Sequence, residues 1–281
     1  MMLGFAEMQH ENVIMVWRCP SCEGQLNEHE TGMRCSLNHS FDRAKEGYVN
    51  LLPAQHKRSR NPGDSAEMIL GRRKVHEALL YQPLAQRLVD TLAARGGVNT
   101  LLDMGCGEGF YGGVVTQRLP HVSVYGIDVS KPAVKFAAKR YGHHHYAVAS
   151  SRRLPIISST IDCVLSVFSP CSDAEVARVL RPRGVYLEVG PGAKHLWEIK
   201  SALYDAPLEH KAMRRAMSGG TLLDSGEVGY EKTLDNTQLQ ALLAATPFGF
   251  RGLRERRAEL QTRTEFPITM AFSWRLFAVV E

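Results

Sequence analysis

The stretch that most constrains the fold of this chain runs from Leu101 to Gly109 and reads LLDMGCGEG. The apolar residues before Asp103 predict a short buried strand, and the glycines that follow predict a tight turn into a helix. Such a turn presents backbone N–H groups at a helix N-terminus, which suits a polar or anionic ligand. The stretch therefore predicts one strand–turn–helix unit of an α/β domain, with a ligand at the turn.

A second carboxylate, at the end of the predicted strand Val122–Asp128, indicates the kind of ligand. An aspartate in this place accepts hydrogen bonds from both hydroxyls of a ribose. The glycine spacing, Gly105-x-Gly107-x-Gly109, differs from the G-x-G-x-x-G of dinucleotide-binding proteins. Together with Asp103 it resembles motif I of the Rossmann-like methyltransferases, which implies S-adenosylmethionine as cofactor and Asp103 as a partner of its ammonium group. The alternative is a glycine-rich turn without a ligand.

Four residues near the N-terminus have the types and spacing of metal ligands. The pattern is C-x2-C followed by C-x3-H, formed by Cys19, Cys22, Cys35 and His39. It predicts a tetrahedral structural zinc site, because four protein ligands leave no open position on the metal. The alternatives are free cysteines in a small hairpin and a redox-active C-x-x-C pair, although the latter does not account for Cys35 or His39. His29 is a spare candidate for the fourth ligand.

Composition is that of an ordinary globular protein of the cytoplasm. The 281 residues carry a formal net charge of +5, which is compatible with nucleic acid without requiring it. No apolar run approaches the ~18 residues of a membrane span, and no signal peptide is recognised, so we expect no membrane partner. The six cysteines do not form a secreted disulfide framework, which favours a reducing compartment.

Changes in pattern predict four segments along the chain. These are a disordered extension (1–14), a zinc-binding RNA-recognition domain (15–52), a basic linker (53–76) and the methyltransferase domain (77–281). The linker carries a cationic cluster beside the zinc site, made of Lys57, Arg58 and Arg60 with Arg72, Arg73 and Lys74 further on. This cluster favours phosphate binding, and a solvated charged linker is the alternative.

From Thr100 onward, predicted strands and helices alternate, which indicates a parallel α/β sheet whose ligand lies beyond the carboxyl ends of the strands. The groups expected on that rim are Gly105–Gly109, Asp128, Ser150–Ser151 and Ser169–Cys171. Either Ser150 or Ser151 is a candidate partner of adenine. Further along, we expect helices at 197–204, 208–217 and 237–245, and a closing strand pair of Phe248–Arg251 with Ile268–Leu276. A metal site at the three histidines 143–145 is not favoured, because consecutive side chains point in different directions.

The order of motifs over nearly the whole chain resembles one family. After the zinc pattern come KEGYVNLLP (45–53), KRSR (57–60), GDS (63–65) and the glycine turn, as in the 23S rRNA guanine-N1 methyltransferases of the RlmA type. The resemblance implies a Rossmann-like, mostly parallel seven-stranded sheet with a small N-terminal zinc domain. It also implies a homodimer that methylates N1 of a guanine in a hairpin loop of 23S rRNA, guanine 745 rather than the neighbouring 748. By position, Tyr81, Gly107, Glu108 and His195 are then cofactor contacts.

Several points stay open at this stage. Guanine N1 carries a proton at neutral pH, so a general base or hydrogen bonds to O6 must assist. Asp173, Glu188 and His195 are candidate bases, and none is favoured. Tyr81 lies over the cofactor or packs in the core. Two other classes are a methyltransferase for a small molecule or protein, and a non-catalytic RNA-binding protein.

Overall fold

The computed structural model describes residues 16–56, 62–213, 216–250 and 252–279. The predicted extension at residues 1–14 and the basic residues Lys57, Arg58 and Arg60 lie outside the described residues. Within the described ranges, no helix is both long enough and apolar enough to cross a membrane.

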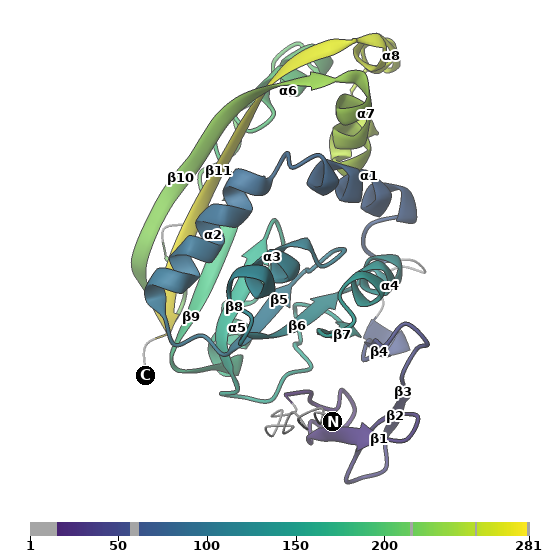
Figure 1. Ribbon diagram of the computed structural model, residues 1–281, viewed down its shortest axis with the longest axis vertical. Coiled ribbons are helices and arrows are strands. Elements are labelled where there is room, and N and C mark those ends of the chain that lie inside the picture. The colour runs from purple at the N-terminus through teal and green to yellow at the C-terminus, as the bar shows by residue number, and fades with distance from the viewer. Residues whose placement is uncertain (1–15, 57–61, 214–215, 251, 280–281) are drawn as a thin grey trace, which may run out of the picture.

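One eight-stranded sheet forms the centre of the molecule (Figure 1). Its strands, in spatial order, are β10 (Gly220–Asp235), β11 (Glu265–Val279), β9 (Leu180–Pro191), β8 (Ile161–Val167), β5 (Thr100–Met104), β6 (Ser123–Asp128), β7 (His145–Val148) and β4 (Val49–Asn50). Strands β9 to β4 run parallel to one another, whereas β11 and β10 are antiparallel to their neighbours. The predicted Rossmann-like, mostly parallel sheet is confirmed, and the strand beyond the expected seven is β4 from the N-terminal segment.

Helices pack on both faces of this sheet. Leu101 of β5 lies in one core with α2 (Gln82–Arg95) and α3 (Phe110–Arg118), and Leu102 lies in another core with α5 (Asp173–Val179). Successive strand residues point to opposite faces, so a strand covered on both sides must be apolar at every position. This is why the continuous apolar run before the glycine turn forms the central strand.

The N-terminal segment forms a small sheet of β1 (Leu26–His29), β2 (Gly32–Cys35) and β3 (Ser40–Asp42) at one end of the molecule (Figure 1). It is attached to the main sheet twice. Its strand β4 pairs with β7, and Trp17 packs edge-on against Tyr125 of β6 with 5.6 Å between ring centroids. The metal-ligand segment therefore shares a hydrophobic core with the main sheet and is not a separate domain joined only by a linker.

The second half of the predicted linker is a helix, α1 (Ala66–Glu77), with Ser65 as its N-cap. This helix lies beside α7 (Asn236–Ala245), as Figure 1 shows. Gly71 is at the crossing, where an added Cβ would lie 2.8 Å from the backbone nitrogen of Ala245, so only glycine permits this approach. The crossing at Gly71 therefore determines the orientation of the residues that follow it in α1, beginning with Arg72.

The prediction for the closing strand pair was right for Ile268–Leu276, which lies within β11, and wrong for the partner of that strand. Strand β11 pairs along its length with β10, from Gly220 opposite Val279 to Asp235 opposite Glu265, and the hairpin reaches past the sheet toward α7 and α8 (Arg254–Thr262) (Figure 1). Part of the expected strand at 248–251 is instead a short 3₁₀ helix, η2 (Pro247–Gly249). The helix expected at 208–217 is absent from the described part of that segment. Strand β10 is polar, glycine-containing and largely exposed, so its pairing with the more buried β11 overrides a weak local signal.

Candidate active site and metal-binding cluster

Two adjoining cavities open at the carboxyl edge of the parallel strands. The first, of about 690 Å³, is lined by Asp128, Ser150 and Ser151, and we call it the aspartate cavity. The second, of about 670 Å³, is lined by Tyr81, Phe110 and other rings, and we call it the aromatic cavity. Both are lined by Arg72, Gly105, Val167 and Phe168, which therefore mark their junction.

The glycine turn lies at this junction, between β5 and α3. Gly105, Gly107 and Gly109 have φ angles of 78°, 56° and 85°, which L-residues with side chains rarely adopt. The backbone N–H groups of Gly105 and Cys106 donate to the carbonyl of Ile127 at 2.8 and 2.9 Å, which ties the turn to β6. Three glycines are thus required by the backbone conformation, and Gly105 and Gly107 border the cavities as predicted.

Asp128 lies at the end of β6 in the aspartate cavity. Its carboxylate accepts hydrogen bonds from the N–H of Gly107 at 3.0 Å and from the N–H of Ser130 at 2.7 Å. Burial raises the pKa of Asp128 above its usual range, and these two amides oppose that effect. Each carboxylate oxygen keeps a further lone pair for a ligand hydroxyl. Ser150 and Ser151, predicted near adenine, line the same cavity.

Asp103 and Tyr111 each carry a buried polar atom that lacks a partner. Asp103 is 2% exposed, and among the described residues nothing donates to its Oδ2. The hydroxyl of Tyr111, one residue into α3, is likewise buried without a partner, and this residue lines the aromatic cavity. Burial raises the pKa of Asp103 to about 7. Buried polar groups are rarely left unpaired, so the Tyr111 hydroxyl fits a polar ligand in the aromatic cavity. Asp103 itself lines neither cavity, and its place as a cofactor contact stays a prediction.

Glu108 reaches the aromatic cavity, but its carboxylate is already engaged. It lies 2.8 Å from Nδ1 of His76 and accepts from Nη1 of Arg140 at 3.0 Å, at 2% exposure. The His76 ring stacks on Phe110, with 4.0 Å between centroids. The sequence pattern did not single out His76, because its position in α1 looks like any other helical residue.

Tyr81 packs in the core and also lines the aromatic cavity, and its contact with the cofactor stays a prediction. Its ring packs edge-on against Phe272 with centroids 5.1 Å apart. Burial raises the pKa of its hydroxyl to about 12, so it stays protonated at neutral pH.

His195 lines the aromatic cavity, and a backbone hydrogen bond holds its ring. Its Nδ1 accepts from the backbone N–H of Ala271 at 3.3 Å, so the proton of the neutral ring is on Nε2. Burial lowers the pKa of His195 to about 3. This tautomer argues against His195 as a general base. The other two candidates, Asp173 and Glu188, line neither cavity.

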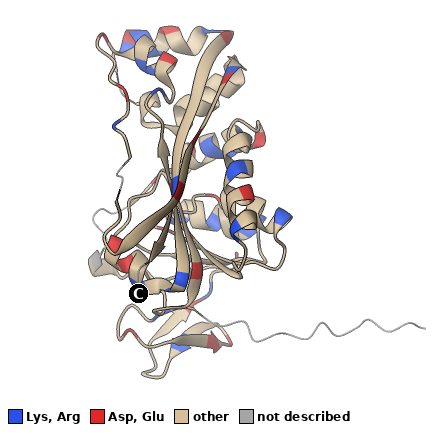
Figure 2. Ribbon diagram, turned by 90° about the vertical axis from the view of Figure 1, so that its left-hand side faces the viewer, with Lys and Arg blue, Asp and Glu red and all other residues tan. Residues whose placement is uncertain are grey.

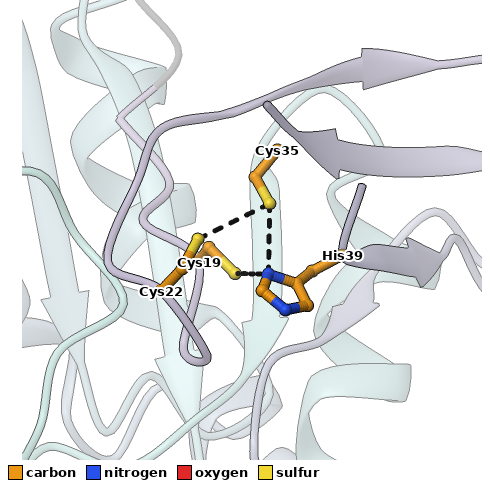
Figure 3. Close-up of side chains that lie close together, drawn as sticks. All are labelled: Cys19, Cys22, Cys35 and His39. Atoms are coloured by element: carbon orange, nitrogen blue, oxygen red, sulfur yellow. Dashed lines mark hydrogen bonds between the residues drawn. The ribbon is translucent and has the colours of Figure 1, made fainter. Parts of the chain in front are cut away.

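The four predicted metal ligands come together (Figure 3). Their ligand atoms all lie within 4.8 Å of one another. Sγ of Cys22 is 3.6 Å from Sγ of Cys35, and Nδ1 of His39 is 3.6 Å from Sγ of Cys19 and 3.3 Å from Sγ of Cys35. A tetrahedral zinc site with Zn–S bonds of about 2.3 Å has edges of about 3.8 Å, close to these separations.

Hydrogen bonds favour the thiolate form at one member of this cluster, Cys35. Although burial opposes ionisation, bonds from the backbone of His39 and Leu37 and from Cys22 lower the pKa of Cys35 to about 6. Thiolates are the form that binds zinc. His29 is not part of the cluster. Among the described residues, the histidines at 143–145 form no metal-type grouping.

The fold, the glycine turn and this cluster define the class of protein. It is an S-adenosylmethionine-dependent methyltransferase with an N-terminal zinc ribbon. Residues 17–60 match the family model described as the N-terminal domain of RlmA, a zinc ribbon, and residues 101–184 match a methyltransferase domain.

The chain belongs to the family of 23S rRNA (guanine-N1)-methyltransferases. The 23S rRNA (guanine(748)-N(1))-methyltransferase of Streptomyces fradiae is 34% identical over 197 residues, which cover 69% of each chain. The names of two other relatives describe them provisionally as 23S rRNA guanine-N1 methyltransferases. The one from Micromonospora griseorubida is 35% identical over 69% of this chain and 72% of its own. The one from Bacillus subtilis is 29% identical over 91% of this chain and 94% of its own.

Proposed function

We propose that this protein transfers a methyl group from S-adenosylmethionine to N1 of guanine 745 in a hairpin loop of 23S rRNA in the cytoplasm. One observation carries the proposal beyond a generic methyltransferase. Arg18, Cys19 and Pro20 of the metal-ligand segment line the same cavity as Asp128 and Ser150. The segment assigned to RNA recognition therefore borders the cofactor site, where an RNA acceptor must arrive.

The donor is assigned to the junction of the two cavities. Asp128 accepts from its ribose hydroxyls, and Ser150 or Ser151 contacts its adenine. Gly105 and Gly107 let the backbone pass close to it, and Asp103 pairs with its ammonium group. When bound, S-adenosylmethionine supplies an activated methyl group on a sulfonium.

We also assign Tyr81, Glu108 and His195 as contacts of the donor, on the side of the aromatic cavity. Tyr81 and His195 line the aromatic cavity directly. Because both oxygens of the Glu108 carboxylate are bonded in this structure, its influence on the donor is expected to pass through the His76 ring.

The zinc site is assigned to Cys19, Cys22, Cys35 and His39. Zinc binding stabilises the folded form of this segment, which is too short to form a large hydrophobic core of its own. Because this segment packs against the main sheet through Trp17, its metal is expected to support the aspartate cavity as well as the RNA surface.

The aromatic cavity is assigned to the acceptor base. RNA bases are recognised when they are unstacked and held against aromatic side chains. Phe168, 44% exposed at the junction, offers such a face, and the Nε2–H of His195 is expected to donate to a carbonyl oxygen such as guanine O6. A donor to O6 stabilises the anion formed when N1 loses its proton. Holding N1 in line with the donor supplies much of the remaining acceleration.

RNA recognition is expected to rest on shape and local contacts. In the view of Figure 2, Lys and Arg are interspersed with Asp and Glu along the ribbon. We also propose that the enzyme acts as a homodimer. Light scattering of the full chain tests this, with an expected mass of twice the 31.3 kDa of one chain.

Guanine 748 is the second candidate, because the Streptomyces fradiae relative carries that position in its name. The test is transfer of labelled methyl from S-adenosylmethionine to unmodified 23S rRNA, followed by nuclease mapping of the label. A methyl on N1 also blocks base pairing, so primer extension stops beside it. Label at 745 supports the proposal, and label at 748 replaces it with the second candidate. Absence of label from rRNA, with methylation of another acceptor, refutes both.

A further inference from the structure

The residues assigned so far leave the negatively charged group of the donor without a partner. S-adenosylmethionine carries an α-carboxylate beside its ammonium, and Asp103 accounts only for the ammonium. A carboxylate held in a half-enclosed site needs a cation or several N–H and O–H donors. Within the part of the chain that the structure describes, the long cationic side chains lining the two cavities are Arg18, Arg72, Arg152, Arg153 and Lys200.

Four of these five cations are badly placed for that role. Arg18 and Arg153 line only the aspartate cavity and are paired with Glu23 at 3.4 and 2.8 Å. Arg152 follows the serines assigned to adenine and also lines only that cavity. Lys200 lines only the aromatic cavity, where its Nζ donates to the carbonyl of Leu208 at 2.7 Å.

Arg72 is the cation at the junction, where it lines both cavities together with Gly105. Its guanidinium is held on two sides. Nη1 is 2.7 Å from Oδ2 of Asp64, and Nε donates to the carbonyl of Ala245 at 3.4 Å. A guanidinium has five N–H donors in a planar fork, so these contacts leave N–H groups for a carboxylate. The side chain is 37% exposed, which leaves it accessible to a ligand.

Asp64 connects this arginine to the ribose side of the site. Its backbone carbonyl accepts from Oγ of Ser130 at 2.8 Å, two residues beyond Asp128. Gly63 lies so close that an added Cβ would be 2.9 Å from Val129. The Gly63–Asp64 turn thus packs on the end of β6 while its carboxylate holds Arg72. The Gly63–Asp64 segment therefore contacts both the ribose side of the donor site and Arg72.

Tyr111 lines the aromatic cavity together with Arg72, and its hydroxyl has no partner among the described residues. Burial raises the pKa of Tyr111, the negative charge of Asp103 raises it further, and the positive charge of Arg72 opposes this. Both charged groups therefore lie within electrostatic reach of this unpartnered hydroxyl. An acidic site, a hydroxyl donor and a basic site beside one glycine turn match the ammonium and carboxylate of an amino acid.

We propose that Arg72, positioned by Asp64, binds the α-carboxylate of S-adenosylmethionine, with the Tyr111 hydroxyl as a second donor. The proposal rests on the proposed function only in requiring that the glycine turn binds this donor. It adds a residue from α1, so the segment between the metal-ligand module and the sheet becomes part of the cofactor site.

The test compares two ligands that differ in the amino-acid end, measured by calorimetry on the full-length, zinc-loaded chain. S-adenosylhomocysteine carries the carboxylate, and 5′-methylthioadenosine lacks the whole amino-acid group. Arg72→Gln is expected to weaken S-adenosylhomocysteine binding about 10- to 100-fold, the usual range for a charge-assisted hydrogen bond. Binding of 5′-methylthioadenosine is expected to change less than about twofold, because that ligand makes no such bond.

Arg73→Gln is the matched control. This neighbouring arginine of α1 lines neither cavity and pairs with Glu77 at 2.7 Å, so both affinities should stay at the wild-type level. Arg72→Lys keeps the charge without the fork and should bind S-adenosylhomocysteine with intermediate affinity. If Arg72→Gln proves unstable in thermal unfolding, Arg72→Lys with the same two ligands decides the question.

Two results would overturn the assignment. One is an equal loss for both ligands, which would make Arg72 a structural support of the site. The other is unchanged S-adenosylhomocysteine binding with a salt-dependent rise in the KM for rRNA, which would place Arg72 on an RNA phosphate. Failure of the wild-type chain to bind S-adenosylhomocysteine at all would instead refute the proposed function, so the two failures are distinguishable.

Discussion

Replacing Asp103 by asparagine is expected to make the unliganded protein more stable and its donor site weaker. An aspartate ordinarily has a pKa near 3.9, and burial raises that of Asp103 to about 7. Each pKa unit corresponds to about 1.4 kcal/mol, so at pH 8 the ionised carboxylate costs the native state about 4 kcal/mol. Asparagine is close to isosteric and carries no charge, so Asp103→Asn avoids this cost.

The gain in stability should depend on pH in a defined way. Because the native state binds the Asp103 proton more tightly than the unfolded chain, this carboxyl lowers native stability progressively as the pH rises from about 4 to about 7. Asp103→Asn lacks this dependence. Its advantage over the wild type should therefore be about 2 kcal/mol at pH 5.5 and about 4 kcal/mol at pH 8. Urea unfolding at the two pH values, with zinc present, measures both.

Donor binding should move in the opposite direction. An ammonium group pairs with the ionised form of Asp103, so wild-type affinity for S-adenosylhomocysteine should rise as the pH increases from 6 to 8. Asp103→Asn should bind about 10- to 100-fold more weakly at pH 8 and show little of this rise. Calorimetry across this pH range gives the comparison.

Asp90→Asn serves as the control, since Asp90 is an exposed residue of α2 whose carboxylate accepts from Gln86. It should change neither stability nor affinity by much. The reasoning is refuted if Asp103→Asn is less stable than the wild type at pH 8. It is also refuted if the variant binds S-adenosylhomocysteine within about twofold of the wild type, the margin for a residue that makes no contact with it.

Three further predictions concern neighbouring features. Asp128→Asn should weaken S-adenosylhomocysteine binding about 10- to 100-fold, because the amide cannot accept from Gly107, Ser130 and a ribose together; near-wild-type calorimetry would contradict the ribose role. Cys35→Ser should lose its zinc, as measured by elemental analysis. Because the metal-ligand segment lines part of the aspartate cavity, the variant should also bind S-adenosylhomocysteine more weakly. Full zinc content would contradict the assignment of Cys35 as a ligand. Gly105→Ala should lower the free energy of unfolding by roughly 1–2 kcal/mol because the residue has a φ of 78°, and the added Cβ would overlap Ser169. Thermal unfolding measures the loss of stability, and calorimetry measures the loss of donor binding. Unchanged stability would argue against a constrained turn.

The sequence predicted best what depends on short stretches. The glycine turn and the metal-ligand pattern are each encoded within a few residues, and the structure brings together Cys19, Cys22, Cys35 and His39 as that pattern requires. The parallel sheet followed from buried strands such as β5, whose apolar run allows few other structures.

What the sequence could not show depends on contacts between distant segments. Strand β10 is polar and exposed, so it is a strand only because β11 pairs with it. The pairing of His76 with Glu108 joins α1 to the glycine turn, and nothing local in α1 indicates it. The orientation of Arg72 likewise depends on the crossing of α1 with α7 at Gly71. The predicted division of the chain at residues 52 and 76, and the roles of the individual cofactor contacts, stay predictions.

The pairing of β4 with β7 has a consequence for any attempt to dissect the protein. Val49 lies opposite Ala147, so the edge strand β4 covers β7 and is synthesised long before it. A fragment that starts at α1 would expose the N–H and C=O groups of β7 to other chains, the condition that promotes aggregation. Such a fragment should therefore be poorly soluble, and adding residues 16–56 back as a separate peptide should rescue it. During synthesis the metal-ligand segment therefore leaves the ribosome before β7, the strand that β4 covers.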